Sequence, residues 1–203
     1  MFNKAKNWIS DNPDLSFAIL LSICVYAYFG LTNELFPTHR TGFAIMERFA
    51  VLGLVGLALT LCIIAGEIDL SIGSNAALAA VITVRFTDSL GAPSALLIAL
   101  LVSTSIGAIQ GYFIAYLRVR AIVLTVGTLM LLRGVALFAA EEKTVMLTDF
   151  RVPDFISTKM LWYFSPASLL VILMFVIVGL FMGYTRFGRE IYAIGGARKE
   201  AIA

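Results

Sequence analysis

Long apolar runs without a charged residue recur along the whole sequence. A helix needs about 20 mainly apolar residues to cross the hydrocarbon core of a bilayer. Six runs approach or exceed this length, the fifth with one interruption at Arg133, and they are Leu15–Asn33, Phe49–Gly66, Leu70–Val84, Ser89–Leu117, Ala121–Ala140 and Met160–Thr185. The pattern predicts an all-α, polytopic transmembrane helix bundle of about six spans, within a single domain that covers residues 1–203.

The boundaries of several runs carry further signals. The first run is longer than the core of a cleavable signal peptide, about 7–15 residues, so we expect a retained span. In the fourth run, Gly91 and Pro93 are typical of a turn, which places the start of the span near Leu96. Three aromatic residues beside Lys159, at positions 162–164, are typical of the aromatic belt at a membrane surface.

Composition narrows the class of protein. The 203 residues are 60% hydrophobic and 14% charged, with a mean hydropathy of +0.94. Soluble domains are about 45–50% apolar and about 25% charged, so soluble and disordered classes are excluded. A net charge of +2, without a run rich in lysine and arginine, also excludes a nucleic-acid partner. The lipid bilayer is therefore the expected surrounding of this chain.

The sequence lacks the common catalytic patterns. It contains neither G-x-x-x-x-G-K-[ST], the phosphate-binding loop of many nucleotide-binding proteins, nor the zinc-binding pattern H-E-x-x-H. Its one histidine, His39, lies between two predicted spans, and no G-x-S-x-G motif supplies a nucleophile. We expect a protein that is not an enzyme and that holds no metal or cofactor of its own.

Cationic residues indicate the orientation in the membrane. Six crossings place both ends of the chain on one side, and eight cationic residues share that side: Lys4, Lys6, Arg118, Arg120, Arg186, Arg189, Arg198 and Lys199. Six lie on the other side: Arg40, Arg48, Arg85, Lys143, Arg151 and Lys159. The positive-inside rule therefore predicts a cytoplasmic N-terminus. The loop from Glu141 to Lys159 is then external, and its acidic residues suit contact with a soluble partner.

The densest polar cluster between two runs is Gly66–Asn75. Carboxylates at membrane depth are costly and indicate function, which makes Asp69 and Ser71 candidates for the pathway of a polar solute. The same residue types cap helix N-termini by accepting hydrogen bonds from unpaired N–H groups. The two roles are compatible, because a broken helix whose N-terminus points into a transporter cavity presents the same groups to a substrate.

Small and polar residues inside the spans favour packing roles. Gly107 and Gly111 have the four-residue spacing that lets helix backbones approach closely in lipid. Gln110 either forms an interhelical hydrogen bond, which is the preferred interpretation, or lines the pathway. Arg133 is expected to be structural, by snorkelling or by bonding carbonyls or a carboxylate within the bundle, and contact with a substrate is the alternative.

Three motifs, in order, resemble one known family. Residues 66–74 read Gly-Glu-Ile-Asp-Leu-Ser-Ile-Gly-Ser, which resembles the G-x-I-D-L-S-[VI]-G-S signature of the sugar-type permease subunits of bacterial ABC importers. These form the ribose, xylose, arabinose and galactose permease family. Residues 116–134 resemble the middle motif of that family, and residues 185–196 resemble its cytoplasmic motif. One small departure is Ala197, where the family commonly has asparagine.

The resemblance implies the membrane-spanning permease subunit of an ATP-driven importer for a sugar or sugar-like small polar solute, in the bacterial cytoplasmic (inner) membrane. Implied partners are a cytoplasmic ABC ATPase that binds the ATP, a periplasmic sugar-binding protein and a second permease subunit. Residues 186–203 would form a cytoplasmic coupling segment, with ATPase-coupling candidates at Arg186, Gly188, Arg189, Gly195 and Gly196. Family members are typically longer, with several more spans, so we expect that a C-terminal portion is missing.

Two other classes of function compete with this interpretation. An ion-coupled secondary transporter or channel, without an ATPase partner, would use Glu67 and Asp69 as intramembrane acids, and its uptake would follow an ion gradient. An intramembrane enzyme would need a nucleophile and a base that meet inside the bilayer, and the sequence supplies no such pair. The permease is therefore the preferred hypothesis.

Overall fold

A computed structural model describes residues 13–34, 36–141, 143, 151–160 and 162–196. Its secondary-structure elements are all helices within these ranges, as the apolar runs predict. They are α2 (Pro13–Thr32), α3 (His39–Ile64), α4 (Ile72–Leu90), α5 (Ala92–Ala115), α6 (Ala121–Ala139), α7 (Arg151–Ile156), α8 (Pro166–Tyr184) and α9 (Arg186–Gly196). The predicted all-α class is confirmed.

Five of these helices, α2, α3, α5, α6 and α8, are long and apolar enough to cross a membrane. The predicted third span corresponds to α4, which is 19 residues long and does not belong to this set. Polar residues near both of its ends lower its hydropathy: Asn75 in the first turn, and Arg85 and Asp88 in the last turns. The described chain is therefore a polytopic helical bundle in which α4 is the least apolar of the long helices.

Local sequence explains where several helices begin. Gly91 adopts a φ of +81° between α4 and α5, a conformation that favours glycine. Pro93 lies in the first turn of α5, where its missing N–H costs no hydrogen bond, so the span begins at Ala92 and not near Leu96. Ser165 and Ser168 form a reciprocal capping box at the start of α8.

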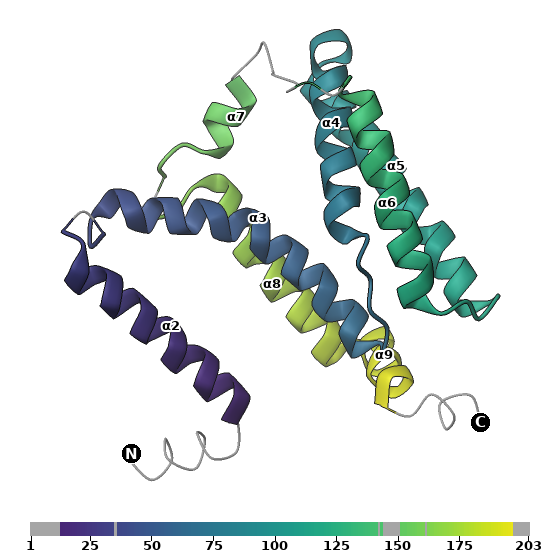
Figure 1. The fold of residues 1–203 in the computed structure, drawn as a ribbon, viewed down its shortest axis with the longest axis horizontal. Helices are drawn as coiled ribbons and strands as arrows, with labels where there is room; N and C mark the ends of the chain where they lie inside the picture. Colours follow the sequence, from purple (N-terminus) through teal and green to yellow (C-terminus); the bar gives the residue numbers. More distant parts are fainter. Residues whose placement is uncertain (1–12, 35, 142, 144–150, 161, 197–203) are drawn as a thin grey trace.

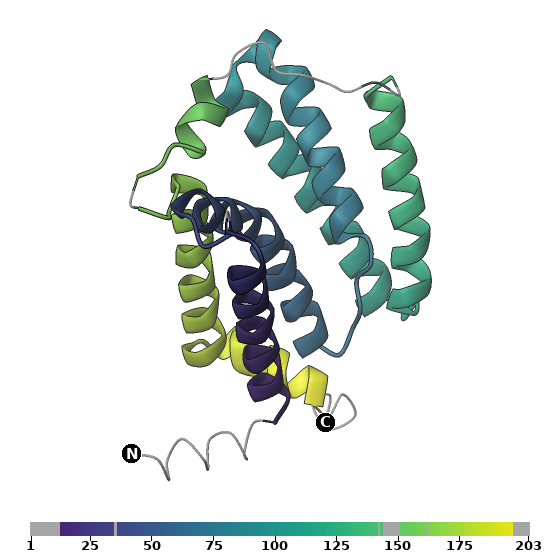
Figure 2. The same ribbon diagram turned by 60° about the vertical axis from the view of Figure 1, so that its left-hand side comes forward.

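The helices form two groups (Figure 1). In one group α4 packs on α5 and α6, and in the other α3 and α9 pack on α8. Figure 2 shows the same division, with α4, α5 and α6 on one side and α3 and α8 on the other. The segment between α3 and α4 joins the two groups, while α2 has no buried residue. This connecting segment is thus placed between two separately packed bodies.

The buried core is small for a chain of this size. Leu78, Leu132 and Ala136 form its centre between α4 and α6. The accessible surface is 15,084 Å², whereas a compact soluble protein of this mass exposes about 9,300 Å². Most of the large side chains on α2, α5 and α8 are exposed and apolar, as suits helices surrounded by lipid.

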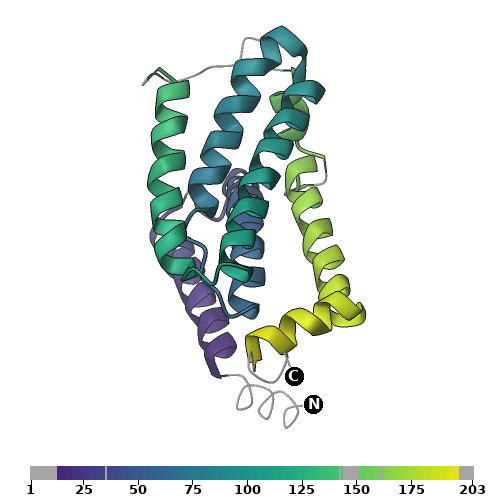
Figure 3. The same ribbon diagram turned by 90° about the vertical axis from the view of Figure 1, so that its right-hand side faces the viewer.

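Helix α9 turns sharply away from α8. The hydroxyl of Thr185, at the corner, accepts a hydrogen bond from the N–H of Gly188 at 3.1 Å. Figure 3 shows α9 lying crosswise at the end of α8, at the same end of the molecule as the start of α2. The beginning and the end of the described chain therefore lie at one end of the bundle, as an even number of crossings requires.

Candidate functional site

The segment between α3 and α4, residues 65–71, begins with a well-formed helix end. The N–H of Gly66 donates to the carbonyl of Ile63 at 2.9 Å, and the N–H of Glu67 donates to the carbonyl of Cys62 at 3.0 Å. With a φ of +79° at Gly66, these bonds form a Schellman motif. The chain then runs without regular structure until α4 begins at Ile72. We call residues 66–70 the α3–α4 linker.

The three predicted pathway residues meet at the end of this linker. Asp69 Oδ1 accepts hydrogen bonds from the N–H and the hydroxyl of Ser71, each at 2.7 Å. The Gln110 amide, on α5, donates to Ser71 Oγ at 2.9 Å. Ser71 and Gln110 are buried, with 1% and 6% of their surfaces exposed, and Asp69 is half-buried. Residues 39 positions apart thus form one polar cluster.

This geometry bears on both roles that the sequence left open. Ser71 occupies the N-cap position of α4 but makes no capping bond with its side chain. Asp69 instead accepts from the N–H of Ser71, which orders the chain just before the helix. Gln110 on α5 donates a hydrogen bond to Ser71 at the start of α4, which is the interhelical bond that the sequence favours for it. The cluster fixes the approach to α4, and its half-buried carboxylate is the part nearest to solvent.

Thr125, on α6, is a further member of this region that sequence reasoning did not single out. It is 1% exposed, and its hydroxyl is 3.4 Å from the carbonyl oxygen of Ile68 in the linker. It lies in the middle motif, at residues 116–134, which is the signal that could have identified it. Thr125 of α6 thus contacts the linker itself, and Gln110 of α5 contacts Ser71 directly after it.

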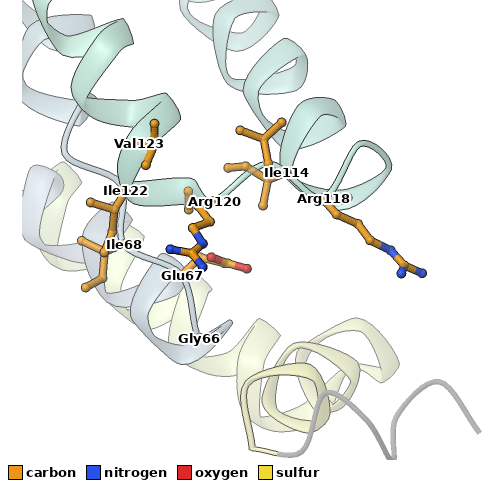
Figure 4. Close-up of a pocket in the computed structure, with 11 residues that line it drawn as sticks. Gly66, Glu67, Ile68, Ile114, Arg118, Arg120, Ile122 and Val123 are labelled. Carbon is orange, nitrogen blue, oxygen red and sulfur yellow. The ribbon is translucent and has the colours of Figure 1, made fainter.

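A cavity of about 880 Å³ opens beside the linker. It is lined by Gly66, Glu67 and Ile68 on one side, and by residues 114–115 and 118–123 of the α5–α6 turn on the other. Glu67 and Arg120 both line this cavity, and Figure 4 shows the side chain of Arg118 pointing away from them. The sequence does not predict this cavity, because the two segments that line it are about 50 residues apart. The walls of the cavity are mainly apolar, and Glu67, Arg118 and Arg120 are its charged lining residues.

The predicted coupling residues lie on α9. Arg186 and Arg189 are exposed, and Arg189 donates to the carbonyl of Tyr184 at 3.5 Å. Gly188 is buried in the corner, where a Cβ atom would lie 2.5 Å from the Cα of Met182. A Cβ at Gly196 would meet no atom within 4 Å, whereas one at Gly195 would overlap the end of α3. Residues 197–203 of the predicted segment lie outside the described part of the chain.

The predicted packing residues Gly107, Gly111 and Arg133 make few contacts within the described part of the chain. A Cβ added at Gly107 or Gly111 would meet no atom of another described element within 4 Å. Both face away from the neighbouring helices of the described chain, so the close helix approach predicted for them is not formed there. Arg133 is exposed and takes part in none of the hydrogen bonds or ion pairs among the described residues. The structural role of Arg133 stays a prediction.

Comparison with known proteins gives consistent matches. The family model described as "Branched-chain amino acid transport system / permease component" matches residues 42–201. The autoinducer 2 import system permease protein LsrC of Yersinia enterocolitica is 31% identical over 208 residues, which cover 99% of this chain and 57% of the relative. The protein of the same name from Yersinia pestis is 31% identical over 192 residues, 91% of this chain and 54% of the relative. The chain thus spans just over half the length of these relatives. No solved structure matches it significantly.

Proposed function

Because the chain belongs to the family of branched-chain amino acid transport system permease components, we propose that it forms the membrane-spanning part of an ATP-driven importer for a sugar or sugar-like small polar solute. The family and the relatives are transport permeases, in agreement with the ABC-importer resemblance of the three motifs. The sugar-like solute rests on the first motif, residues 66–74, and its resemblance to sugar-type permeases.

One observation carries the proposal: segments of all three motifs meet at one end of the bundle. The linker belongs to the first motif, and the α5–α6 turn, in the middle motif, faces it across the cavity. Helix α9, in the third motif, contacts the end of α3 at Gly66. Motifs that are far apart in sequence thus build one local structure, as expected when a pathway and a coupling element must act together.

In this proposal the end that carries α9 faces the cytoplasm, with the N-terminus on the same side. The exposed Arg186 and Arg189 then face a cytoplasmic ABC ATPase, which binds the ATP. The opposite end, with α7 and the acidic Glu141 and Asp154, faces the periplasmic binding protein. A second permease subunit completes the transporter, and its contacts lie on the apolar surface left open by the described helices.

We assign the cavity beside the linker to the cytoplasmic mouth of the pathway. Glu67 and Arg120 supply a carboxylate and a guanidinium on its facing walls (Figure 4), groups that hydrogen-bond the hydroxyls of a polar solute. The cluster of Asp69, Ser71 and Gln110 holds the wall in place, and Asp69 presents its carboxylate at the edge of the pathway.

Charge reversal on α9 tests the coupling part of this proposal. In the assembled transporter, Arg189→Glu is expected to reduce the recovery of the ATPase with affinity-tagged permease and to separate ATP hydrolysis from solute uptake. Lys159→Glu, an equal charge reversal at the opposite end, is the control for ATPase recovery. Unchanged uptake and unchanged ATPase recovery in Arg189→Glu would contradict the assignment of α9 as the coupling helix.

A further inference from the structure

Helix α9 touches the end of α3 through glycine and bare backbone. A Cβ atom at Gly195 would overlap the carbonyl oxygen of Ile64 and would lie 2.9 Å from its carbonyl carbon and 3.2 Å from the carbonyl carbon of Ala65. A Cβ at Gly66 would in turn lie 3.4 Å from the Cα of Gly195. No side chain separates the two backbones at this point. A shift of α9 toward α3 therefore cannot be absorbed by a change of side-chain rotamer.

The end of α3 explains why a carbonyl group projects toward α9. The Schellman bonds use the carbonyls of Cys62 and Ile63, and the carbonyl of Leu61 accepts from the N–H of Ala65. The carbonyl of Ile64 takes part in none of these bonds and points beyond the helix end. Any residue larger than glycine at position 195 must therefore displace either α9 or the start of the linker.

Helix α9 is also fixed at its other end. Gly188 lies against the backbone of Met182, and Phe187 stacks on Phe181 of α8 with ring centroids 6.5 Å apart. Helix α9 thus contacts α8 at one end and the backbone of α3 at the other. Its Gly195 end touches the first residue of the linker, which also begins the wall of the cavity.

We propose that Gly195 is the positioning residue through which α9 moves the α3–α4 linker, and with it the cavity wall and the polar cluster at Ser71. This inference rests on the proposed function and adds a route to it: the Cβ position of Gly195 lies against the backbone of α3, so Gly195 acts on the permease itself. A displacement of α9 reaches Gly66 directly and is passed along the linker to Asp69. Gly195 is thus assigned to transmission, and the exposed arginines of α9 to docking.

Gly195→Ala in the assembled, reconstituted transporter separates transmission from docking. We expect uptake per ATP hydrolysed to fall about tenfold, within the range typical of coupling between sites. This ratio does not depend on how much ATPase is recovered with the permease. Gly183→Ala is the matched control, because a Cβ at Gly183 meets no atom within 4 Å. If Gly195→Ala transports as well as Gly183→Ala, the inference is overturned.

A second measurement leaves Gly195 unchanged, so it tests whether α9 and the linker move together even if the Gly195→Ala variant fails to assemble. With Cys24 and Cys62 replaced by serine, spin labels on the exposed Leu70 and Ala193 report the distance between the linker and α9. We expect this distance to stay constant when ATP binds, while both labels move relative to a label at the exposed Leu97, near the end of α5 that lies away from the polar cluster. Movement of α9 without the linker would overturn the inference. Failure of the proposed function itself would show instead as absent ATP-driven uptake in the unsubstituted transporter.

Discussion

Replacing Ser71 with alanine removes the hydroxyl that joins the start of α4 to α5. This hydroxyl donates to Asp69 at 2.7 Å and accepts from the Gln110 amide at 2.9 Å. In the variant the buried Gln110 amide loses that partner, and an unsatisfied buried donor costs about 1–3 kcal/mol. Interhelical hydrogen bonds in membrane proteins average about 0.6 kcal/mol, with a maximum of about 1.7, because the unfolded helices also find partners. We therefore expect the free energy of unfolding to fall by about 1–2 kcal/mol.

A double-mutant cycle with Gln110→Leu isolates the bond between Ser71 and Gln110. The free energy of unfolding is measured by titrating mixed detergent micelles with sodium dodecyl sulfate, and a coupling energy of about 0.6–1.7 kcal/mol is expected. The control is Ser105→Ala on the same helix as Gln110, since the exposed Ser105 hydroxyl donates only to the carbonyl of Leu101 one turn away. A coupling energy of zero, together with a Ser71→Ala variant that is no more destabilised than Ser105→Ala, would show that the bond between Ser71 and Gln110 does not stabilise the fold.

Substitutions at three other positions test the same structure. Gly188→Ala sets a Cβ against the backbone of Met182, so the free energy of unfolding should fall by about 1–3 kcal/mol; unchanged thermal unfolding in detergent would contradict the sharp corner. Ser165→Ala removes the acceptor of the Ser168 N–H at 3.2 Å, for an expected loss of about 1 kcal/mol on the same measurement. Asp69→Ala removes the acceptor of two hydrogen bonds, so folded yield and uptake should fall, whereas Asp69→Asn should retain the yield because it keeps an acceptor oxygen. Normal yield and uptake in Asp69→Ala would show that this carboxylate is neither a cap nor a pathway residue.

Charged residues that flank an apolar run predict the ends of some helices correctly and of others wrongly. The fifth run matches α6 to within one residue, since Arg120 and Glu141 flank it directly. The second apolar run begins at Phe49, whereas the helix that contains it, α3, begins at His39. Charged residues end a hydrophobic run without ending a helix, because a helix continues into the polar region outside the hydrocarbon core.

The polar cluster was predictable as a set of residue types but not as a contact. Asp69 and Ser71 were identified by their cost at membrane depth, and Gln110 by its polarity within a span. That Gln110 bonds to Ser71 depends on how α4 packs against α5, which periodicity does not specify. The contact of Gly195 with Ile64 is of the same kind: it requires the corner at Gly188 and the end of α3 to be placed together.

The outward direction of Gly107, Gly111 and Arg133 could not be read from spacing. A four-residue repeat of small residues predicts a close helix contact but does not name the helix that makes it. In the described chain these residues face away from their neighbours. In the proposed transporter this face is available to other helices of the complete assembly or to lipid.

In the proposed function, ATP hydrolysis by a partner subunit drives solute through this permease. The most direct test follows accumulation of labelled sugar-like solutes in cells that produce the complete importer, first with ion gradients collapsed by ionophores and then with ATP depleted. The proposed function predicts accumulation that survives loss of the ion gradients and stops when ATP is depleted. Accumulation that follows an ion gradient and ignores ATP depletion would contradict it and favour an ion-coupled transporter.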